Sequence, residues 1–242
     1  MARQRIHHLA DAEGHGSTEI APHQTHTPGD GRGGCMLYLS PVWHSLHPNL
    51  QNRFGYIIGI DAGKGPAHGI HAGYPWMLDN GAFSVRWNEA QWLDALDRWH
   101  PYTATCIAAV CPDVVGDASA TLARFWQYAP VIRNHGYKVA FVTQDGLTLD
   151  AVPWAHFDVL FVGGTDRHKL DDSWPFILAA QERGKWVHVG RVNSARRLRL
   201  FARADSCDGT MLAREPSIAR QRYMLAAMED ARGMKRTIAC DI

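Results

Sequence analysis

The sequence predicts a (β/α)8 barrel, an α/β fold in which eight parallel strands and the helices between them close around one core. Eight short apolar runs recur along the chain, and most are continuously apolar, as buried parallel strands are. Amphipathic segments lie between most of these runs, and Gly136 and Gly184 follow two of them, where helices commonly end. An open, doubly wound sheet is the alternative fold.

The predicted strands are apolar runs bounded by polar or glycine-containing turns. In order, they are Met36–Ser40, Phe54–Ile58, Trp76–Asp79, Cys106–Cys111, Lys138–Thr143, Asp158–Val162, Trp186–Gly190 and Asp205–Asp208. The predicted helices carry apolar residues at helical spacing. They are Asn88–Trp99, Ser119–Arg133, Ser173–Arg183, Ala195–Arg203 and Pro216–Met228. The glycine-rich segment Gly55–Pro75 has no helical pattern, so we expect no helix there.

Residues 1–35 differ from the rest of the chain. They are polar and rich in His, Gly, Thr and Pro, without a hydrophobic period of either kind. We therefore expect a disordered extension over 1–35 and a single barrel domain over 36–242. The extension lacks the apolar stretch of a secretory signal, and its irregularly spaced histidines favour a solvated tail over a metal site.

The composition narrows the class of protein. At 46% hydrophobic and 20% charged residues, the 242-residue chain is typical of a globular protein. No apolar run reaches the roughly 18 residues of a spanning helix, so no membrane partner is expected. A net charge of +1 argues against a globally basic nucleic-acid coat. Five cysteines without a CxxC pair predict neither a disulfide framework nor a zinc ribbon, and favour the cytoplasm.

Polar or glycine residues stand where six consecutive predicted strands end, which in a parallel barrel is one mouth. In chain order they are Asp79, Asn80 and Phe83, then Asp113, Gln144, Gly163 and Gly164, Gly190 and Arg191, and Asp208. Any one of them could be a turn or helix-capping residue, but together they predict an active site. Carboxylates suit acid–base and nucleophilic catalysis, and Asp and Gln can bind the edge of a purine on which an aromatic ring stacks.

Five of these segments, in the same order along the chain, resemble motifs of the tRNA-guanine transglycosylase superfamily. Asp79-Asn80-Gly81-Ala82-Phe83 resembles the DSGGF/Y turn, Gln144 the VQGG turn, Gly163-Gly164 the GGL segment and Val189-Gly190-Arg191 the MGVG strand, while Asp205-Ser206-Cys207-Asp208 keeps the D-x-x-D spacing. The spellings CPDVVGD, TQDG, HVGRVNS and DGT are most like the phage and bacterial DNA-guanine transglycosylases, which insert 7-deazaguanines into DNA. The zinc subdomain of the tRNA enzymes, CxCxxC…H, is missing.

The resemblance implies an exchange of guanine in DNA for a free 7-deazaguanine, such as 7-cyano-7-deazaguanine, through a covalent glycosyl-enzyme intermediate. It implies that Asp208 is the nucleophile and Asp79 the general acid and base. Asp113, with Asp117 as the other possibility, and Gln144 would hold the base edge. Asn80, Phe83, Gly163, Gly164, Gly190 and Arg191 would complete the base site. The resemblance implies no metal and no cofactor, and the cytoplasm of a host if a phage encodes the chain. A homo-oligomer and partner proteins both stay open.

Arginines are frequent in the last third of the chain. A phosphate-contacting rim at the barrel mouth and a solvated helix face are both consistent with their spacing. The candidates for nucleic-acid contact are Arg196, Arg197, Arg199, Arg203 and Arg214.

Three other functions stay open. A tRNA-guanine transglycosylase is the nearest, although the missing zinc subdomain argues against it. A barrel isomerase or aldolase acting on a phosphorylated metabolite would use the glycine turns as a phosphate cup, but it predicts a catalytic Lys or His at a strand end, and the sequence shows none plainly. A non-catalytic nucleic-acid-binding barrel would leave Asp79 and Asp208 unexplained. Thiol catalysis by Cys111 or Cys207 is disfavoured.

The early loops supply no further candidate for catalysis. We expect loop or packing roles for four histidines there, His44, His47, His68 and His71. The segment Gly63–Gly73 is a candidate lid over the pocket.

Overall fold

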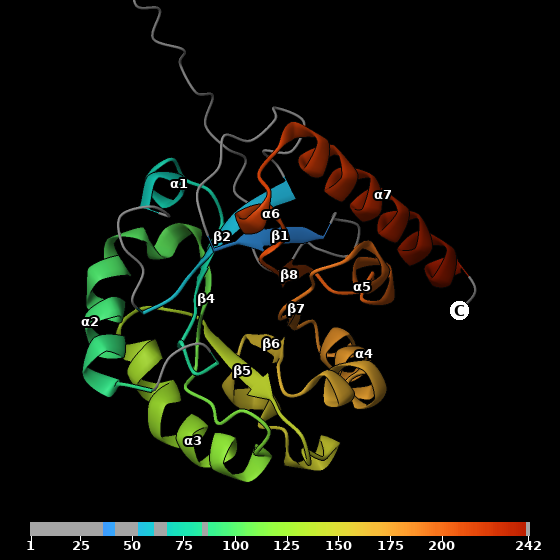
Figure 1. Ribbon diagram of the computed structural model, residues 1–242. Helices are drawn as coiled ribbons and strands as arrows, with labels where there is room; N and C mark the ends of the chain where they lie inside the picture. The colour runs from blue at the N-terminus through green and yellow to red at the C-terminus, as the bar shows by residue number, and fades with distance from the viewer. Residues whose placement is uncertain (1–35, 42–52, 61–66, 84–86, 241–242) are drawn as a thin grey trace, which may run out of the picture.

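A computed structural model describes residues 36–41, 53–60, 67–83 and 87–240 (Figure 1). The predicted extension over 1–35, His44, His47 and the first four residues of the candidate lid, 63–66, lie outside these ranges. The described strands form one closed parallel barrel in chain order, with the first strand paired to the last. The predicted single-domain (β/α)8 barrel is therefore confirmed, and the open doubly wound sheet is wrong.

The strands lie close to their predicted positions because each is a short apolar run buried between the barrel interior and the surrounding helices. They are β1 (Leu37–Ser40), β2 (Phe54–Ile58), β3 (Trp76–Leu78), β4 (Cys106–Val110), β5 (Val139–Thr143), β6 (Val159–Val162), β7 (Trp186–Val189) and β8 (Ser206–Asp208).

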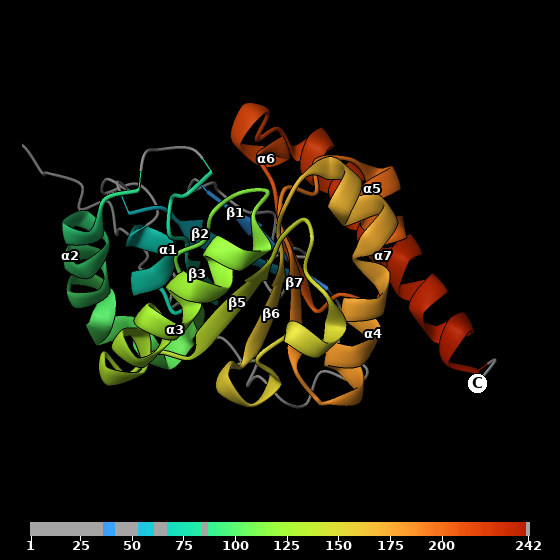
Figure 2. The ribbon, with the colours of Figure 1, turned by 90° about the horizontal axis from the view of Figure 1, so that it is seen from below.

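The helices surround the barrel, with α2 and α3 on one side and α4, α5 and α7 on the other (Figure 2). Their bounds are α1 (Ala67–His71), α2 (Glu89–Trp99), α3 (Ala118–Asn134), α4 (Trp174–Glu182), α5 (Ala195–Leu200), α6 (Met211–Arg214) and α7 (Ile218–Cys240). Side chains cap four of them: Asn88 accepts from the Gln91 N–H, Asp117 from the Ala120 N–H, Ser194 from the Arg197 N–H, and Ser217 from the Arg220 N–H. Because Asp117 caps α3, Asp113 is the pocket residue of the two candidates.

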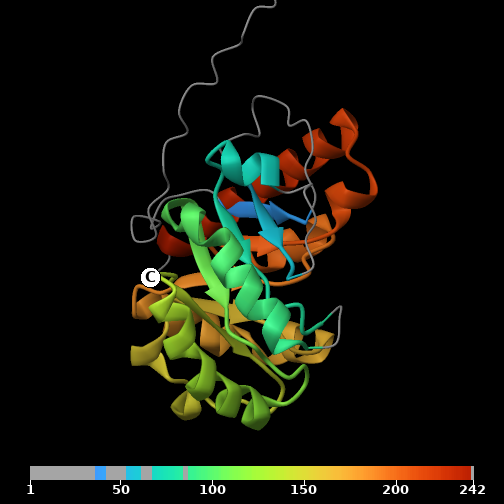
Figure 3. The same cartoon turned by 90° about the vertical axis from the view of Figure 1, so that its left-hand side faces the viewer.

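Three helices differ from the prediction, and one of them is the short helix α6, which was not predicted. The segment Gly55–Pro75 contains α1, which lies beside the upper strands in Figure 3. Gly69 explains how it fits, because a Cβ there would meet the Tyr56 ring at 2.0 Å, so only glycine lets the helix approach β2 this closely. The last helix continues to Cys240 rather than ending at Met228. The amphipathic pattern fades after Met228, which is why the sequence pointed to a shorter helix.

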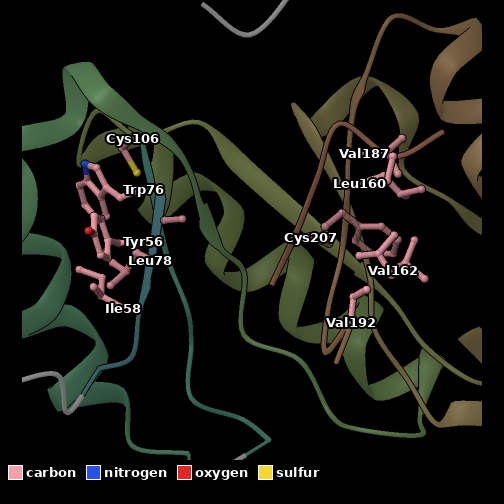
Figure 4. Close-up of a cluster of buried hydrophobic side chains, with 14 of the residues drawn as sticks. Tyr56, Ile58, Trp76, Leu78, Cys106, Leu160, Val162, Val187, Val192 and Cys207 are labelled. Carbon is pink, nitrogen blue, oxygen red and sulfur yellow. The ribbon is translucent and has the colours of Figure 1, made fainter. Parts of the chain in front are cut away.

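Alternate strand residues face two different cores. Outward-facing side chains pack against the helices, as Trp76 and Leu78 of β3 do in Figure 4. The residue between them, Met77, joins a second cluster inside the barrel with Leu39 and Ile57. This inner cluster fills the base of the barrel, and the cavity opens above it, at the carboxyl ends of the strands. Among the described residues, no helix has both the length and the apolar composition that a bilayer crossing requires.

Candidate active site

A cavity of about 510 Å³ opens at the carboxyl ends of the strands, a volume within the usual range for small-molecule sites. Its apolar walls come from inward-facing strand residues such as Ile57, Val142 and Phe161. Every residue that the sequence assigned to catalysis or base binding lines it: Asp79, Asn80, Phe83, Asp113, Gln144, Gly163, Gly164, Gly190, Arg191 and Asp208. Asp79 and Asp208, 129 residues apart in the chain, therefore meet in one place, as the parallel barrel predicts.

Asp113 is held by two side-chain amides. The Asn80 amide donates to Oδ1 at 2.7 Å, and the Gln144 amide donates to Oδ2 at 2.5 Å. Gln144 is itself fixed, because its Oε1 accepts the Gly116 N–H at 2.8 Å. Burial raises the pKa of Asp113, while the hydrogen bond from Asn80 and the charge of Arg124 oppose this shift. The Gln144 amide thus orients Asp113, and each oxygen of that carboxylate keeps a lone pair for a ligand. A direct contact of Gln144 with the base edge stays a prediction.

Asp79 follows β3 and has a different environment. Burial, together with the nearby charges of Asp208 and Asp113, raises its pKa to about 7. Its carboxyl group is therefore close to half protonated at neutral pH. That state suits a group that first gives a proton and then takes one back.

Asp208, the last residue of β8, has a hydrogen-bond partner at each of its carboxylate oxygens. Its Oδ1 lies 3.0 Å from His188 Nε2, and its Oδ2 accepts the Arg191 N–H at 3.2 Å. The side chain is 15% exposed, so the carboxylate is fixed from below and reachable from the cavity.

Two further ionisable residues at the site were missed. Lys169 lies in a single π-helical turn after β6, lines the cavity, and donates from Nζ to the Gly190 carbonyl oxygen at 3.1 Å. Burial lowers the pKa of Lys169 to about 8, against the raising effect of the Asp208 charge. His188 lies within β7 and is fully buried beneath Asp208. Neither residue ends a strand, which is why the sequence showed no Lys or His plainly at a strand end.

The mouth of the cavity carries a stacked pair. The Arg191 guanidinium carbon lies 3.9 Å from the Phe83 ring centroid, and Phe83 is 59% exposed. Arg191 has φ of 63°, the only non-glycine residue of the described ranges with a positive φ. Such a backbone costs about 1–2 kcal/mol. In this conformation its N–H points at Asp208 and its side chain covers one face of the ring that was expected to stack on a base.

The arginines expected to contact nucleic acid lie outside the cavity, and three of them have partners on the protein. Arg197 pairs with Asp166 at 2.8 Å, and Arg199 pairs with Asp230 at 2.7 Å. Arg203 donates to Gln181 Oε1 at 3.1 Å. Arg196 and Arg214 are exposed. The phosphate-contacting rim stays a prediction. Among the five arginines, Arg196 and Arg214 support it best, because their side chains are exposed.

The remaining candidates are structural. Cys111 and Cys207 are buried, and burial raises the pKa of both thiols, which disfavours a thiolate nucleophile. His71 packs against the Tyr102 ring at 4.8 Å, as expected for a packing histidine. Within the described ranges, no three His, Cys, Asp or Glu side chains are grouped as a metal site would need.

Comparison with known proteins supports the fold. No protein-family model matches the chain, and comparison with curated proteins gives no match. Among solved structures, a mandelate oxidase variant bearing an FMN adduct is 17% identical over 82% of this chain and 73% of that chain, with a TM-score of 0.52. The tryptophan synthase α subunit from Legionella pneumophila is 13% identical over 85% of this chain and 93% of that chain, with a TM-score of 0.43. At 17% identity, the likeness to the oxidase shows a shared (β/α)8 fold alone.

Proposed function

We propose that the cavity is the active site of a base-exchange transglycosylase that replaces guanine in DNA with a 7-deazaguanine. The observation that carries the proposal is a pair of carboxylates, Asp79 and Asp208, lining one cavity in unlike surroundings. Each oxygen of Asp208 has a hydrogen-bond partner that fixes its position, as suits a nucleophile, whereas the pKa of Asp79 is raised to about 7, as suits a proton carrier. Carboxyl groups held in such different environments divide the roles of acid and nucleophile.

The two-step reaction balances with these groups. An oxygen of Asp208 attacks C1′ of the target deoxyguanosine, the C1′–N9 bond breaks, and its electron pair leaves with guanine, which takes the Asp79 proton. The incoming base then gives its N9 proton to Asp79 and attacks C1′, and the ester bond to Asp208 breaks. Two displacements at one carbon retain its configuration.

Asp113 supports guanine or its 7-deaza analogue as the base. Those bases present two neighbouring donors, N1–H and the exocyclic amine, which match the two oxygens of one carboxylate. The Asn80 and Gln144 amides already fix those oxygens in the cavity wall. Such preorganisation favours a ligand whose donors stand side by side.

DNA as the second partner follows from the resemblance of the motifs. A base must leave its stack to reach a barrel mouth, at a cost of a few kcal/mol in a duplex. The exposed Arg196 and Arg214 are the candidates for gripping the flanking phosphates. Their replacement by Ala should reduce the salt dependence of DNA binding without removing base exchange at low salt.

The test is incorporation of labelled guanine and of 7-cyano-7-deazaguanine into duplex DNA, single-stranded DNA and bulk tRNA. We expect label in DNA, none with Asp208→Asn, and retention with Asp171→Asn, which removes an exposed carboxylate elsewhere. A protein–DNA adduct that survives denaturation should form with the wild type only. Label in tRNA alone would show that the enzyme acts on tRNA rather than on DNA. No label with either base in any polymer would refute the proposal.

The position and burial of Lys169 favour a second candidate function, that of a barrel aldolase or isomerase acting on a phosphorylated metabolite. A buried amine with its pKa lowered to about 8 can add to a carbonyl and form a Schiff base. Borohydride treatment with a phosphorylated keto sugar would then add a stable mass to Lys169, and Lys169→Met would abolish it. Absence of that mass, with base exchange present, excludes this candidate.

A further inference from the structure

A chain of four hydrogen-bonded side chains runs from Asp208 into the barrel wall. The Trp186 indole N–H donates to Ser206 Oγ at 2.8 Å, and the same Oγ lies 2.8 Å from His188 Nδ1. The other ring nitrogen of His188, Nε2, lies 3.0 Å from Asp208 Oδ1. His188 and Ser206 are fully buried and face each other because they are register partners on β7 and β8.

The residue at each end of this row of side chains can form its hydrogen bond in one direction only. An indole N–H donates and cannot accept, and an ionised carboxylate accepts and cannot donate. His188 must therefore carry a hydrogen on Nε2 to bond ionised Asp208. Ser206 already accepts from Trp186, so its hydroxyl hydrogen is available to His188 Nδ1. A neutral imidazole satisfies every bond in the chain.

We propose that His188 is a positioning residue for Asp208, held as the neutral Nε2–H tautomer by Ser206 and Trp186. This inference rests on the proposed role of Asp208 as nucleophile. A neutral donor orients Oδ1 without protonating it, so the carboxylate keeps the electron pair with which it attacks C1′. The Arg191 N–H holds Oδ2, so both oxygens are fixed before the substrate arrives.

The opposite tautomer would weaken the site. It would turn the Nε2 lone pair toward Asp208 Oδ1 at 3.0 Å, where two acceptors repel each other. The ring cannot easily turn away, because Phe161 packs on it with centroids 4.6 Å apart. Ser206 and Trp186 thus act on the nucleophile through the tautomer of His188.

The first measurement needs no substrate. Histidine ¹⁵N resonances of the wild-type protein are recorded at neutral pH, and the His188 pair is assigned by its loss in His188→Gln. We expect an unprotonated Nδ1 and a protonated Nε2. Ser206→Ala should move the pair away from this pattern, because Nδ1 then loses its donor. Protonation of both nitrogens in the wild type, or of Nδ1 alone, would overturn the proposal.

The second measurement compares two replacements of His188 in the base-exchange assay. Glutamine can direct an amide N–H at Asp208 Oδ1, whereas methionine of similar length cannot. We expect His188→Met to lower kcat on the order of 10- to 100-fold with little change in KM for the free base, and His188→Gln to retain most of the activity. Equal losses in folded Met and Gln variants would refute a donor role.

The two proposals fail in different ways. If the wild type exchanges no base but His188 shows the expected tautomer, the transglycosylase function fails and the hydrogen-bonded chain stands. If the wild type exchanges bases and His188→Met is as active as the wild type, the positioning role fails and the function stands. Should His188→Met fail to fold, the ¹⁵N pattern of the wild type and of Ser206→Ala still decides the proposal.

Discussion

Replacing Asp79 with Asn tests whether the pocket raises the pKa of this carboxyl group. Its pKa is about 7 in the folded protein against an ordinary value of 3.8, so between these two pH values the folded state holds a proton that the unfolded state has released. The protonated carboxyl group contributes its full stability below pH 3.8, and that stability is lost as the pH rises to about 7. Asparagine keeps the shape and has no such dependence.

The size of the effect follows from the two pKa values. Between pH 5 and pH 8, wild-type stability should fall by about 2.5 kcal/mol relative to Asp79→Asn. This is an upper bound, because Asp79 keeps some contact with water at the cavity. Asp208→Asn removes one of the charges that raise the pKa, so it should shrink the difference.

Urea denaturation of the wild type, Asp79→Asn and the exposed control Asp171→Asn, at several values between pH 5 and pH 8, measures the effect. Only Asp79→Asn should gain stability over the wild type as the pH rises. Parallel curves for the wild type and Asp79→Asn would show that Asp79 ionises at an ordinary pH. The argument for Asp79 as the proton carrier would then fail as well.

Three local features give further outcomes for denaturation experiments. A Cβ on Gly209 would lie 2.6 Å from the Val192 carbonyl oxygen, so Gly209→Ala should cost about 1–3 kcal/mol, and an unchanged midpoint would contradict this close approach. Arg191→Gly should be about 1 kcal/mol more stable than Arg191→Ala, because both lose the guanidinium but only alanine keeps the strain at φ 63°; equal stabilities would count against that strain. Asp117→Ala should lose about 1 kcal/mol and Asp117→Asn much less, since the side chain accepts the Ala120 N–H at the start of α3.

The fold could be predicted because its strands are buried on both faces. Runs such as Cys106–Val110 are apolar throughout, so their positions are plain without any knowledge of their partners. The short helix α1 could not be predicted from helix propensity. Gly69 within it is required because the outward-facing Tyr56 ring of β2 leaves no room for a Cβ. Local sequence carries no record of such a contact.

The candidate site was predictable to the extent that its residues follow strand ends. Asp79 and Asp208 stand there, and parallel topology alone brings them to one mouth. His188 lies inside a strand, where a polar residue is usually interpreted as a packing residue. Because side chains alternate between the two faces of β7, His188 lies on the inner face together with Trp186. Lys169 reaches the cavity through a π-helical turn that side-chain spacing does not reveal. Strand-end polarity therefore locates a candidate site in a barrel, whereas the groups that tune its electrostatics lie below that site, among inward-facing polar residues that end no strand.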